Sequence, residues 1–153
     1  MAKINLQQDV GYKIEVNDNG DYIVIDYEDV NFPVKLNEMY TQIQKATDTL
    51  DKSMANIEKQ TFTEEDGSFL SGKELARLEA INAFYSKGRN AIDIVFGEGA
   101  SMKIFGSANR LMMFKEFFEA IEPHLEKAGI DFNAKIEETR QKYQVKKDNK
   151  KVI

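Results

Sequence analysis

The residues that come closest to a recognisable chemical motif lie between Gly97 and Lys103. Their sequence, GEGASMK, superficially resembles the loop that cradles phosphate in nucleotide-binding proteins. That loop needs four residues between its first glycine and a Gly-Lys-Ser/Thr end, and this spacing is missing. The dinucleotide-binding pattern G-x-G-x-x-G fails as well, because Met102 occupies the position of its last glycine. We therefore expect no nucleotide cofactor.

Catalytic and metal-binding side chains are scarce elsewhere in the chain. It contains no cysteine and one histidine, His124, which follows Pro123 in an acidic stretch. The sequence near His124 supplies no paired nucleophile, so we interpret this histidine as a surface residue and not as a general base. A transition-metal site is not expected without a thiolate and with one imidazole. The sequence predicts a protein that is not an enzyme and holds no cofactor or metal.

Composition and charge narrow the expected partners. The 153 residues are 42% hydrophobic and 31% charged, which is typical of a folded single domain. No apolar run approaches the ~20 residues that span a bilayer, and residues 1–10 lack the apolar run of a signal peptide. The net charge of −5 argues against nucleic acid as a general partner. We expect binding neither to membranes nor to nucleic acid.

Two segments carry charges of opposite sign. Residues 15–30 contain six acidic side chains and no basic one, whereas residues 140–153 contain six basic side chains and one acidic. One interpretation is that both segments are simply solvated. The other is that the basic end of one copy meets the acidic segment of another copy, which would produce self-association.

The N-terminal part of the sequence predicts a β-hairpin. Residues 12–16 alternate apolar and polar side chains, residues 17–20 are turn formers, and residues 22–27 are β-branched and aromatic. A lone hairpin is marginal in water, so it must pack on helices or pair with another chain. Pro33, with Phe32 held extended before it, is expected to end the β part.

Residues 35–60 predict a long helix. Its apolar and small residues alternate spacings of four and three, which is a heptad pattern of period 3.5. They are Leu36, Tyr40, Ile43, Thr47, Leu50, Met54 and Ile57, with Met39 and Ala46 beside them. This stripe fits helix packing within the chain or a self-associating coiled coil. Residues 61–69 follow as a solvated linker that lacks the ligand spacing of a calcium-binding loop.

A second helix is expected to begin at Ser71, because Ser71 and Glu74 form the S-x-x-E capping-box pattern. It should extend to Phe96, with Gly88 as either a close-approach point or a break. Its apolar positions are Leu75, Leu78, Ile81, Tyr85, Ile92, Val95 and Phe96.

A glycine-rich loop is expected next, anchored to the core by two Phe-Gly pairs. The anchoring residues are Phe96, Gly97, Gly99, Phe105 and Gly106. Ser107 or Asn109 could then cap a third helix, which is apolar nearly all round and is either central in the fold or covered by a partner. Its main face consists of Leu111, Phe114, Phe118, Ile121 and Leu125, with Met112, Met113 and Phe117 off that face.

The C-terminal part predicts further helices. Pro123 is interpreted as a kink or as the first residue of a short helix that ends at Gly129. Asp131 is expected to cap a last helix over residues 132–145, and the lysine-rich residues beyond it to fray. The predicted organisation is one globular domain over residues 1–130, followed by a charged helix and basic tail over residues 131–153. The predicted fold class is α+β, mainly α, with an N-terminal β-hairpin packed on a bundle of three to four helices.

Residues 91–123 carry a family resemblance. Residues 91–101 read AIDIVFGEGAS, residues 103–106 read KIFG, and residues 114–123 read FKEFFEAIEP. This order resembles the small tail assembly chaperones of long-tailed phages and prophages of Gram-positive bacteria. In those proteins an FGEGTS-x-KIFG loop precedes a helix with an FF-x-x-x-x-P pattern, and Ala100 stands here where threonine is common. The similarity in layout extends over about residues 10–128.

The resemblance implies a non-enzymatic protein that binds the tape measure protein in the host cytoplasm during phage assembly and self-associates along it. The tail tube protein is a second candidate partner. The candidate partner-binding residues are Glu98, Lys103, Met112, Met113 and Phe117. Methionine beside phenylalanine suits a deformable surface for helical clients, although the same residues would also serve as ordinary core. Two other functions stay open: a structural tail component retained in the virion, and a bacterial adaptor or regulatory protein.

Overall fold

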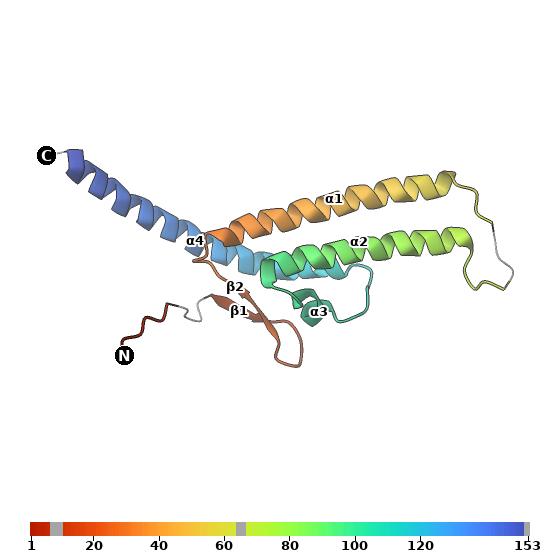
Figure 1. The fold of residues 1–153 in the computed structure, drawn as a ribbon, viewed down its shortest axis with the longest axis horizontal. Helices are drawn as coiled ribbons and strands as arrows, with labels where there is room; N and C mark the ends of the chain where they lie inside the picture. The colour runs from red at the N-terminus through yellow and green to blue at the C-terminus, as the bar shows by residue number, and fades with distance from the viewer. Residues whose placement is uncertain (7–10, 64–66, 152–153) are drawn as a thin grey trace. The chain divides into compact units, whose positions relative to one another are not determined.

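The computed structural model describes residues 1–6, 11–63 and 67–151, which are mainly helical (Figure 1). In these ranges two strands precede four helices: β1 (Tyr12–Glu15), β2 (Tyr22–Ile25), α1 (Asn31–Lys59), α2 (Gly72–Phe96), α3 (Ala100–Phe105) and α4 (Met113–Lys151). The predicted class, α+β and mainly α with an N-terminal hairpin, is confirmed. None of the helices in these ranges has the length and apolarity needed to span a membrane.

The chain forms two compact units. One contains residues 1–32 and 115–153, and the other contains residues 33–114. The domain boundary predicted at residue 130 falls inside α4. The predicted linker over residues 61–69 lies partly outside the described residues, which omit 64–66.

In the first unit, β1 and β2 form the predicted antiparallel hairpin. The register pairs Tyr12 with Ile25 and Ile14 with Ile23, so these four side chains share one face. Ile23 and Ile25 are 3% and 0% exposed. A backbone hydrogen bond of 2.9 Å joins the two ends of the turn formed by residues 16–21.

Tyr12 joins the hairpin to α4 within this unit. Its hydroxyl lies 3.1 Å from Nδ1 of His124, and the two ring centroids are 5.3 Å apart. The ammonium group of Lys127, one turn further along α4, lies 5.0 Å from the centroid of the Tyr12 ring. The prediction that His124 is a surface residue is therefore wrong, because its half-buried ring packs on the hairpin.

α4 is one continuous helix from Met113 to Lys151. Pro123 lies inside it, so the predictions of a helix end at Gly129 and a new helix capped by Asp131 are wrong. A proline removes one backbone donor, but burial on both sides of it keeps the helix together: Ile121 is 4% exposed and Ala128 is 7% exposed. The helix also continues through the lysine-rich residues that were expected to fray.

α1 begins at Asn31, two residues before Pro33, although the sequence predicts an extended residue in front of this proline. Phe32 is helical, because Pro33 lies in the first turn, where its missing N–H has no helical partner to lose. Asp29 provides the start signal: its carboxylate accepts a hydrogen bond from the Asn31 N–H at 2.8 Å, and its carbonyl accepts one from the Phe32 N–H at 3.0 Å. The prediction of an extended Phe32 is wrong.

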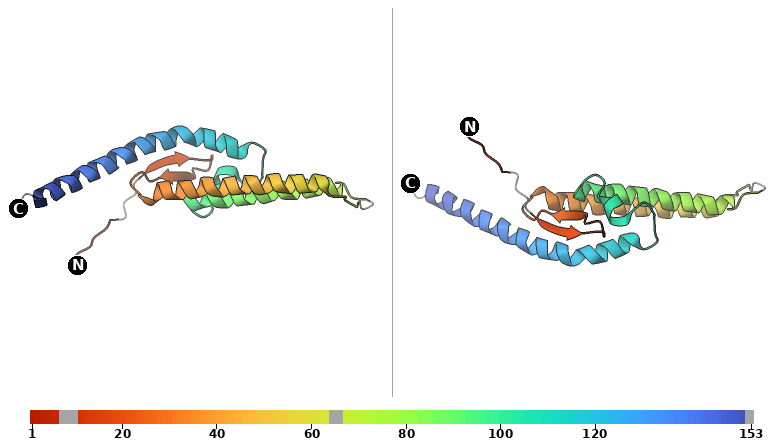
Figure 2. Two further views of the ribbon diagram at one scale, coloured as in Figure 1. Left: turned by 90° about the horizontal axis from the view of Figure 1, so that it is seen from above. Right: turned by 90° about the horizontal axis from the view of Figure 1, so that it is seen from below.

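In the second unit, α1 and α2 run side by side in opposite directions (Figures 1 and 2). The buried line of α1 differs by one residue from the predicted heptad stripe. Met39 and Ala46 are 1% and 3% exposed, whereas Tyr40 is 47% exposed. Leu36, Ile43, Leu50 and Ile57 are common to the buried line and the predicted stripe. Combined with them, either Met39 and Ala46 or Tyr40 and Thr47 give spacings that alternate between three and four. Tyr40 tolerates solvent because its hydroxyl can bond to water.

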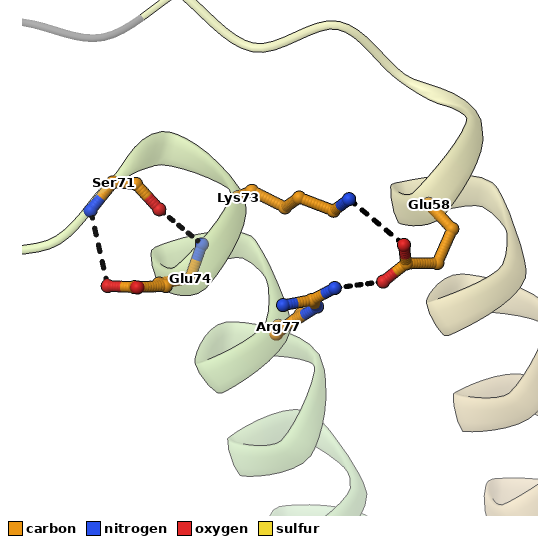
Figure 3. A network of polar contacts seen from close by, with 5 residues as sticks. All are labelled: Glu58, Ser71, Lys73, Glu74 and Arg77. Carbon is orange, nitrogen blue, oxygen red and sulfur yellow. Dashed lines mark hydrogen bonds and ion pairs between the residues drawn. The ribbon is translucent and has the colours of Figure 1, made fainter.

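The end of α1 is tied to the start of α2 by charged side chains (Figure 3). The Glu58 carboxylate pairs with Lys73 at 2.9 Å and with Arg77. The hydrogen bond from Arg77, and then that from Lys73, lowers the pKa of the Glu58 carboxyl. The predicted capping box at the start of α2 is confirmed, because the Ser71 hydroxyl accepts from the Glu74 N–H at 3.1 Å and the Glu74 carboxylate accepts from the Ser71 N–H at 3.4 Å.

We expect Glu58→Gln to lower the melting temperature slightly at neutral pH and not at all in strong acid. A lowered carboxyl pKa contributes stability above the unfolded value of 4.5, and this contribution is lost as the pH falls through the lower folded value. Melting curves recorded from pH 7 down into strong acid follow the loss of this difference. Glu79→Gln removes the same charge from an exposed position as a control. Equal effects of the two variants at pH 7 would show that the ion pair contributes nothing.

Candidate functional site

The predicted glycine loop contains a short helix, α3, between glycines of positive φ. The φ angles are 103° at Gly97, 84° at Gly99 and 71° at Gly106, a region that favours glycine. The Gly97 N–H donates to the Asp93 carbonyl at 2.8 Å, and the Gly106 N–H donates to the Met102 carbonyl at 2.8 Å. The loop prediction is thus right at both ends and wrong in the middle, which is helical.

Asp93, near the end of α2, fixes the start of α3. Its Oδ1 accepts a hydrogen bond of 2.7 Å from the backbone N–H of Ser101. Gly99, the residue just before α3, has no side chain that could do this, and Ser101 is only 5% exposed. The aspartate therefore satisfies a helix-start donor that would otherwise be buried without a partner.

Replacing Asp93 by Ala is expected to lower the free energy of unfolding by about 1–3 kcal/mol, because a buried N–H loses its acceptor. Asp93→Asn keeps an oxygen acceptor, so it should lower the free energy of unfolding by less than Asp93→Ala does. Denaturant unfolding of both variants measures this order. Glu98→Ala is the control, since Glu98 is an exposed acid in the same loop and should change the value by less than about 0.5 kcal/mol. If Asp93→Ala is as mild as the control, the cap does not stabilise the loop.

An aromatic cluster holds α2, α3 and the start of α4 together. The ring centroid of Phe114 lies 5.0 Å from Tyr85, 5.8 Å from Phe84 and 5.4 Å from Phe105. Gly88 leaves room for this ring, because a β-carbon at residue 88 would lie 2.3 Å from Cε2 of Phe114. The close-approach interpretation of Gly88 is confirmed, and the alternative of a break is wrong because α2 is continuous.

Arg89 holds residues 106–112, the connection between α3 and α4, which we call the strap. Its Nε donates to the side-chain oxygen of Asn109 at 3.0 Å, and one terminal nitrogen donates to the Ala108 carbonyl at 2.9 Å. The other terminal nitrogen is buried without a hydrogen-bond partner. The guanidinium carbon lies 5.6 Å from the centroid of the Phe105 ring, so a cation–π interaction offsets part of the desolvation cost.

Asn109 and Ser107 both belong to the strap, and neither of them caps α4. The helix begins at Met113, beyond the reach of both side chains, so the predicted cap is wrong. The Asn109 amide instead donates to the side chain of Asn82 on α2 at 3.2 Å. Sequence reasoning missed Arg89 and Asn82, whose partners lie 20 and 27 residues further along the chain. Nothing in the local sequence signals these pairings.

The strap leaves large apolar side chains in solvent. Leu111 is 77% exposed and Met112 is 53% exposed. Leu75 and Leu78, at 47% and 45%, lie on the α2 face that also carries Asn82, to which the strap is bonded. We call these four residues the strap surface. Leu111 precedes α4, and the positions of Leu75 and Leu78 on α2 are not covered, so these three apolar positions of the predicted helices do not belong to the core.

Met112 has a backbone conformation that methionine rarely adopts. Its φ is 70°, and among the described residues it is the one non-glycine residue with positive φ. The left-handed region costs a side-chain-bearing residue about 1–2 kcal/mol relative to glycine. Because the Met112 side chain is half in solvent, its burial contributes little stability to offset this cost. Strain at an exposed apolar residue marks a candidate contact position.

The structure separates the five predicted partner-binding residues. Glu98, Lys103 and Met112 are exposed. Met113 is 7% exposed, and its sulfur accepts a hydrogen bond of 3.4 Å from a strap N–H, so it is a core residue and not a contact residue. Phe117 is half-buried and belongs to the first unit, where its ring lies 5.5 Å from that of Phe118.

The loop and the strap expose both apolar and charged side chains. Glu98 presents a carboxylate between two glycines, and Lys103 presents an ammonium group in the last turn of α3. No group of three or more acidic or histidine side chains is placed to hold a metal ion in the parts of the chain that the structure describes. The geometry of the loop and strap therefore suits recognition of another protein surface.

A family model described as a family of unknown function (DUF6673) matches residues 19–152. The matched range contains β2, the helices α1 to α4, the glycine loop and the strap, and it leaves out residues 1–18 and residue 153. No curated protein and no solved structure matches the chain.

Proposed function

The chain belongs to the DUF6673 family, whose function is unknown, and from its own residues we propose that it is a phage or prophage tail assembly chaperone. In this proposal it binds the tape measure protein before the tail tube polymerises, without catalysing a reaction, and several copies coat one client. The resemblance of residues 91–123 to such chaperones supports the proposal. The exposed strap surface is the structural observation on which it mainly rests.

The strap surface has the chemistry that a long helical client requires. Its four side chains are leucine and methionine, which are flexible and adapt to varied helical partners. Large apolar side chains that remain in solvent are common at protein-binding sites, and a hydrogen bond from Asn109 to Asn82 joins the strap to the helix that carries Leu75 and Leu78. A client with repeated apolar stripes could be contacted by many copies of one such surface.

The strap is held by contacts that would keep its surface in one conformation before binding. Arg89 and Asn82 fix its backbone through Asn109, and Asp93 fixes the preceding short helix. Ordering a loop during association costs free energy, so a surface that is ordered in advance binds more tightly for the same contacts. Glu98 and Lys103 could then favour one orientation of the client.

Co-expression of the chain with the neighbouring tape measure protein tests this function. We expect a soluble complex whose native mass gives many copies of the chain for each client. Purified phage particles should lack the chain if it is a chaperone, whereas a structural tail component would be present at fixed copy number. An insoluble, unbound client, or a gene neighbourhood without tail genes, would contradict the proposal and favour an adaptor role.

A further inference from the structure

The turn between β1 and β2 contains the dipeptide Asn19-Gly20, and both residues are exposed. Asn-Gly is common in hairpin turns because glycine adopts positive φ without steric cost, and the φ of Gly20 is 84°. The same dipeptide places a side-chain amide next to a backbone nitrogen that carries no neighbouring side chain. Asparagine is among the residues that limit the chemical lifetime of proteins.

The Asn19 carboxamide is not tied to another group. In the described part of the chain no hydrogen bond holds it, because Asn19 is bonded through its backbone N–H, which donates to Oδ1 of Asn17 at 2.9 Å. The Gly20 N–H donates to the Asn17 carbonyl at 3.4 Å, which is longer than the usual range for this kind of bond. Apart from the chain neighbours of Gly20, no described atom would lie within 4 Å of a β-carbon placed there.

Asn17 lies in the same turn and is held in place. Its side-chain nitrogen donates to the Asp21 carboxylate at 2.8 Å, and its Oδ1 accepts from the N–H groups of Asn19 and Asp21 at 2.9 Å and 3.2 Å. A reaction at this carboxamide would break these bonds, and the next residue, Asp18, carries a side chain. Asn17 is therefore an internal reference for the reactivity of Asn19.

We propose that Asn19 is a site of spontaneous deamidation and isoaspartate formation. The Gly20 nitrogen attacks Cγ of Asn19, and the bond from Cγ to the side-chain nitrogen breaks. The proton of the Gly20 N–H leaves with that nitrogen as ammonia, so a cyclic succinimide remains. Water then opens either carbonyl of the ring and gives aspartate or isoaspartate. Proximity within one dipeptide makes the first step unimolecular, and the chemistry is independent of the chaperone function.

Both products change the hairpin. Each adds a carboxylate to residues 15–30, which already carry six acidic side chains and no basic one. Isoaspartate also lengthens the main chain by one carbon inside the turn, whose ends are joined by the 2.9 Å hydrogen bond from Val16 to Asp21. Since the strand register keeps Ile23 and Ile25 buried, a turn of altered length should weaken the packing of the hairpin.

Peptide mapping of the aged full-length chain tests the site. The purified protein is incubated at physiological temperature, digested and analysed by mass spectrometry, and isoaspartate is detected with isoaspartyl methyltransferase. We expect Asn19 to lose its amide before Asn17 and before Asn90, which is exposed on α2 and is followed by alanine. An Asn19 that keeps its amide, or that reacts no faster than Asn17, would overturn the proposal. Aspartate without isoaspartate would contradict the succinimide route.

Two variants at residue 19 connect the chemistry to stability. Asn19→Gln keeps a carboxamide but needs a larger ring to react, so the aged variant should keep its melting temperature while the aged wild type melts lower. Freshly prepared Asn19→Asp has the added charge without the extra main-chain carbon, and it should melt close to the fresh wild type. Equal losses on ageing in the wild type and Asn19→Gln would show that the turn is not the cause.

A fresh Asn19→Asp variant that melts as low as the aged wild type would likewise overturn the effect assigned to isoaspartate.

Discussion

Replacing Phe114 by Ala is expected to lower the free energy of unfolding by about 3–5 kcal/mol. The Phe114 ring is 7% exposed and lies at the centre of the cluster formed with Phe84, Tyr85 and Phe105. Its removal leaves a cavity where α2, α3 and the start of α4 meet, and the continuous helix α2 limits how far the site can collapse. Urea unfolding followed by circular dichroism measures the change.

Phe69→Ala is the matched control, since it removes the same atoms from a side chain that is 99% exposed. Its effect should stay within about 0.5 kcal/mol. A similarly small effect of Phe114→Ala would mean that the aromatic cluster does not hold the second unit together. The slope of the unfolding curve should be the same in all three proteins if the folded state stays intact.

Replacing Gly88 by Ala is expected to destabilise the protein by about 1–3 kcal/mol, although the same change at an open helix position would stabilise it by about 0.5–1 kcal/mol. The reason is space: the added carbon would lie 2.3 Å and 2.5 Å from two ring carbons of Phe114. The ring cannot move freely, because Tyr85 and Phe105 lie on it.

A second substitution turns this prediction into a test of one contact. In a Phe114→Leu background the ring is gone, so Gly88→Ala should become neutral or mildly stabilising. A double-mutant cycle with equilibrium unfolding measures this change of sign. If Gly88→Ala destabilises both backgrounds equally, its cost does not come from Phe114, and the close approach is not what makes glycine necessary.

Features with a local signal were predicted well. The hairpin follows from its alternation and turn residues, and the capping box at Ser71 and Glu74 from four adjacent residues. Gly88 was singled out because glycine is rare inside helices, but the sequence could not choose between a break and a close approach. The choice depends on Phe114, which lies 26 residues away and reaches Gly88 only in the folded chain.

Features that depend on tertiary contacts were missed. Periodicity could not tell that α1 buries Met39 in place of Tyr40, because both fit a four-three spacing. The sequence left open whether Pro123 kinks a helix or begins a new one, and burial on both sides of it keeps α4 continuous. The apolar residues of the strap continue the helical pattern, so the sequence predicts a helix where the structure has a connection.

The structure gives a physical reason for residues inside the resembling motif. Asp93 is the aspartate that precedes the FGEGAS segment, and it accepts the first helix-start hydrogen bond of α3. Gly97, Gly99 and Gly106 take φ values that other residues avoid. These roles concern the shape of the loop. The exposed residues Leu111 and Met112 have no such structural role, which is why we assign the contact to them.

The central claim is that the strap surface binds the client, and the double variant Leu111→Ser/Met112→Ser tests it most directly. Binding to a purified tape measure segment should weaken at least about 30-fold, as expected when apolar contacts worth about 2 kcal/mol are lost, while the melting curve stays the same. Val34→Ser removes another exposed apolar side chain, on α1, and should bind normally. If the wild type binds the segment and the double variant binds it with the same affinity, the claim is contradicted.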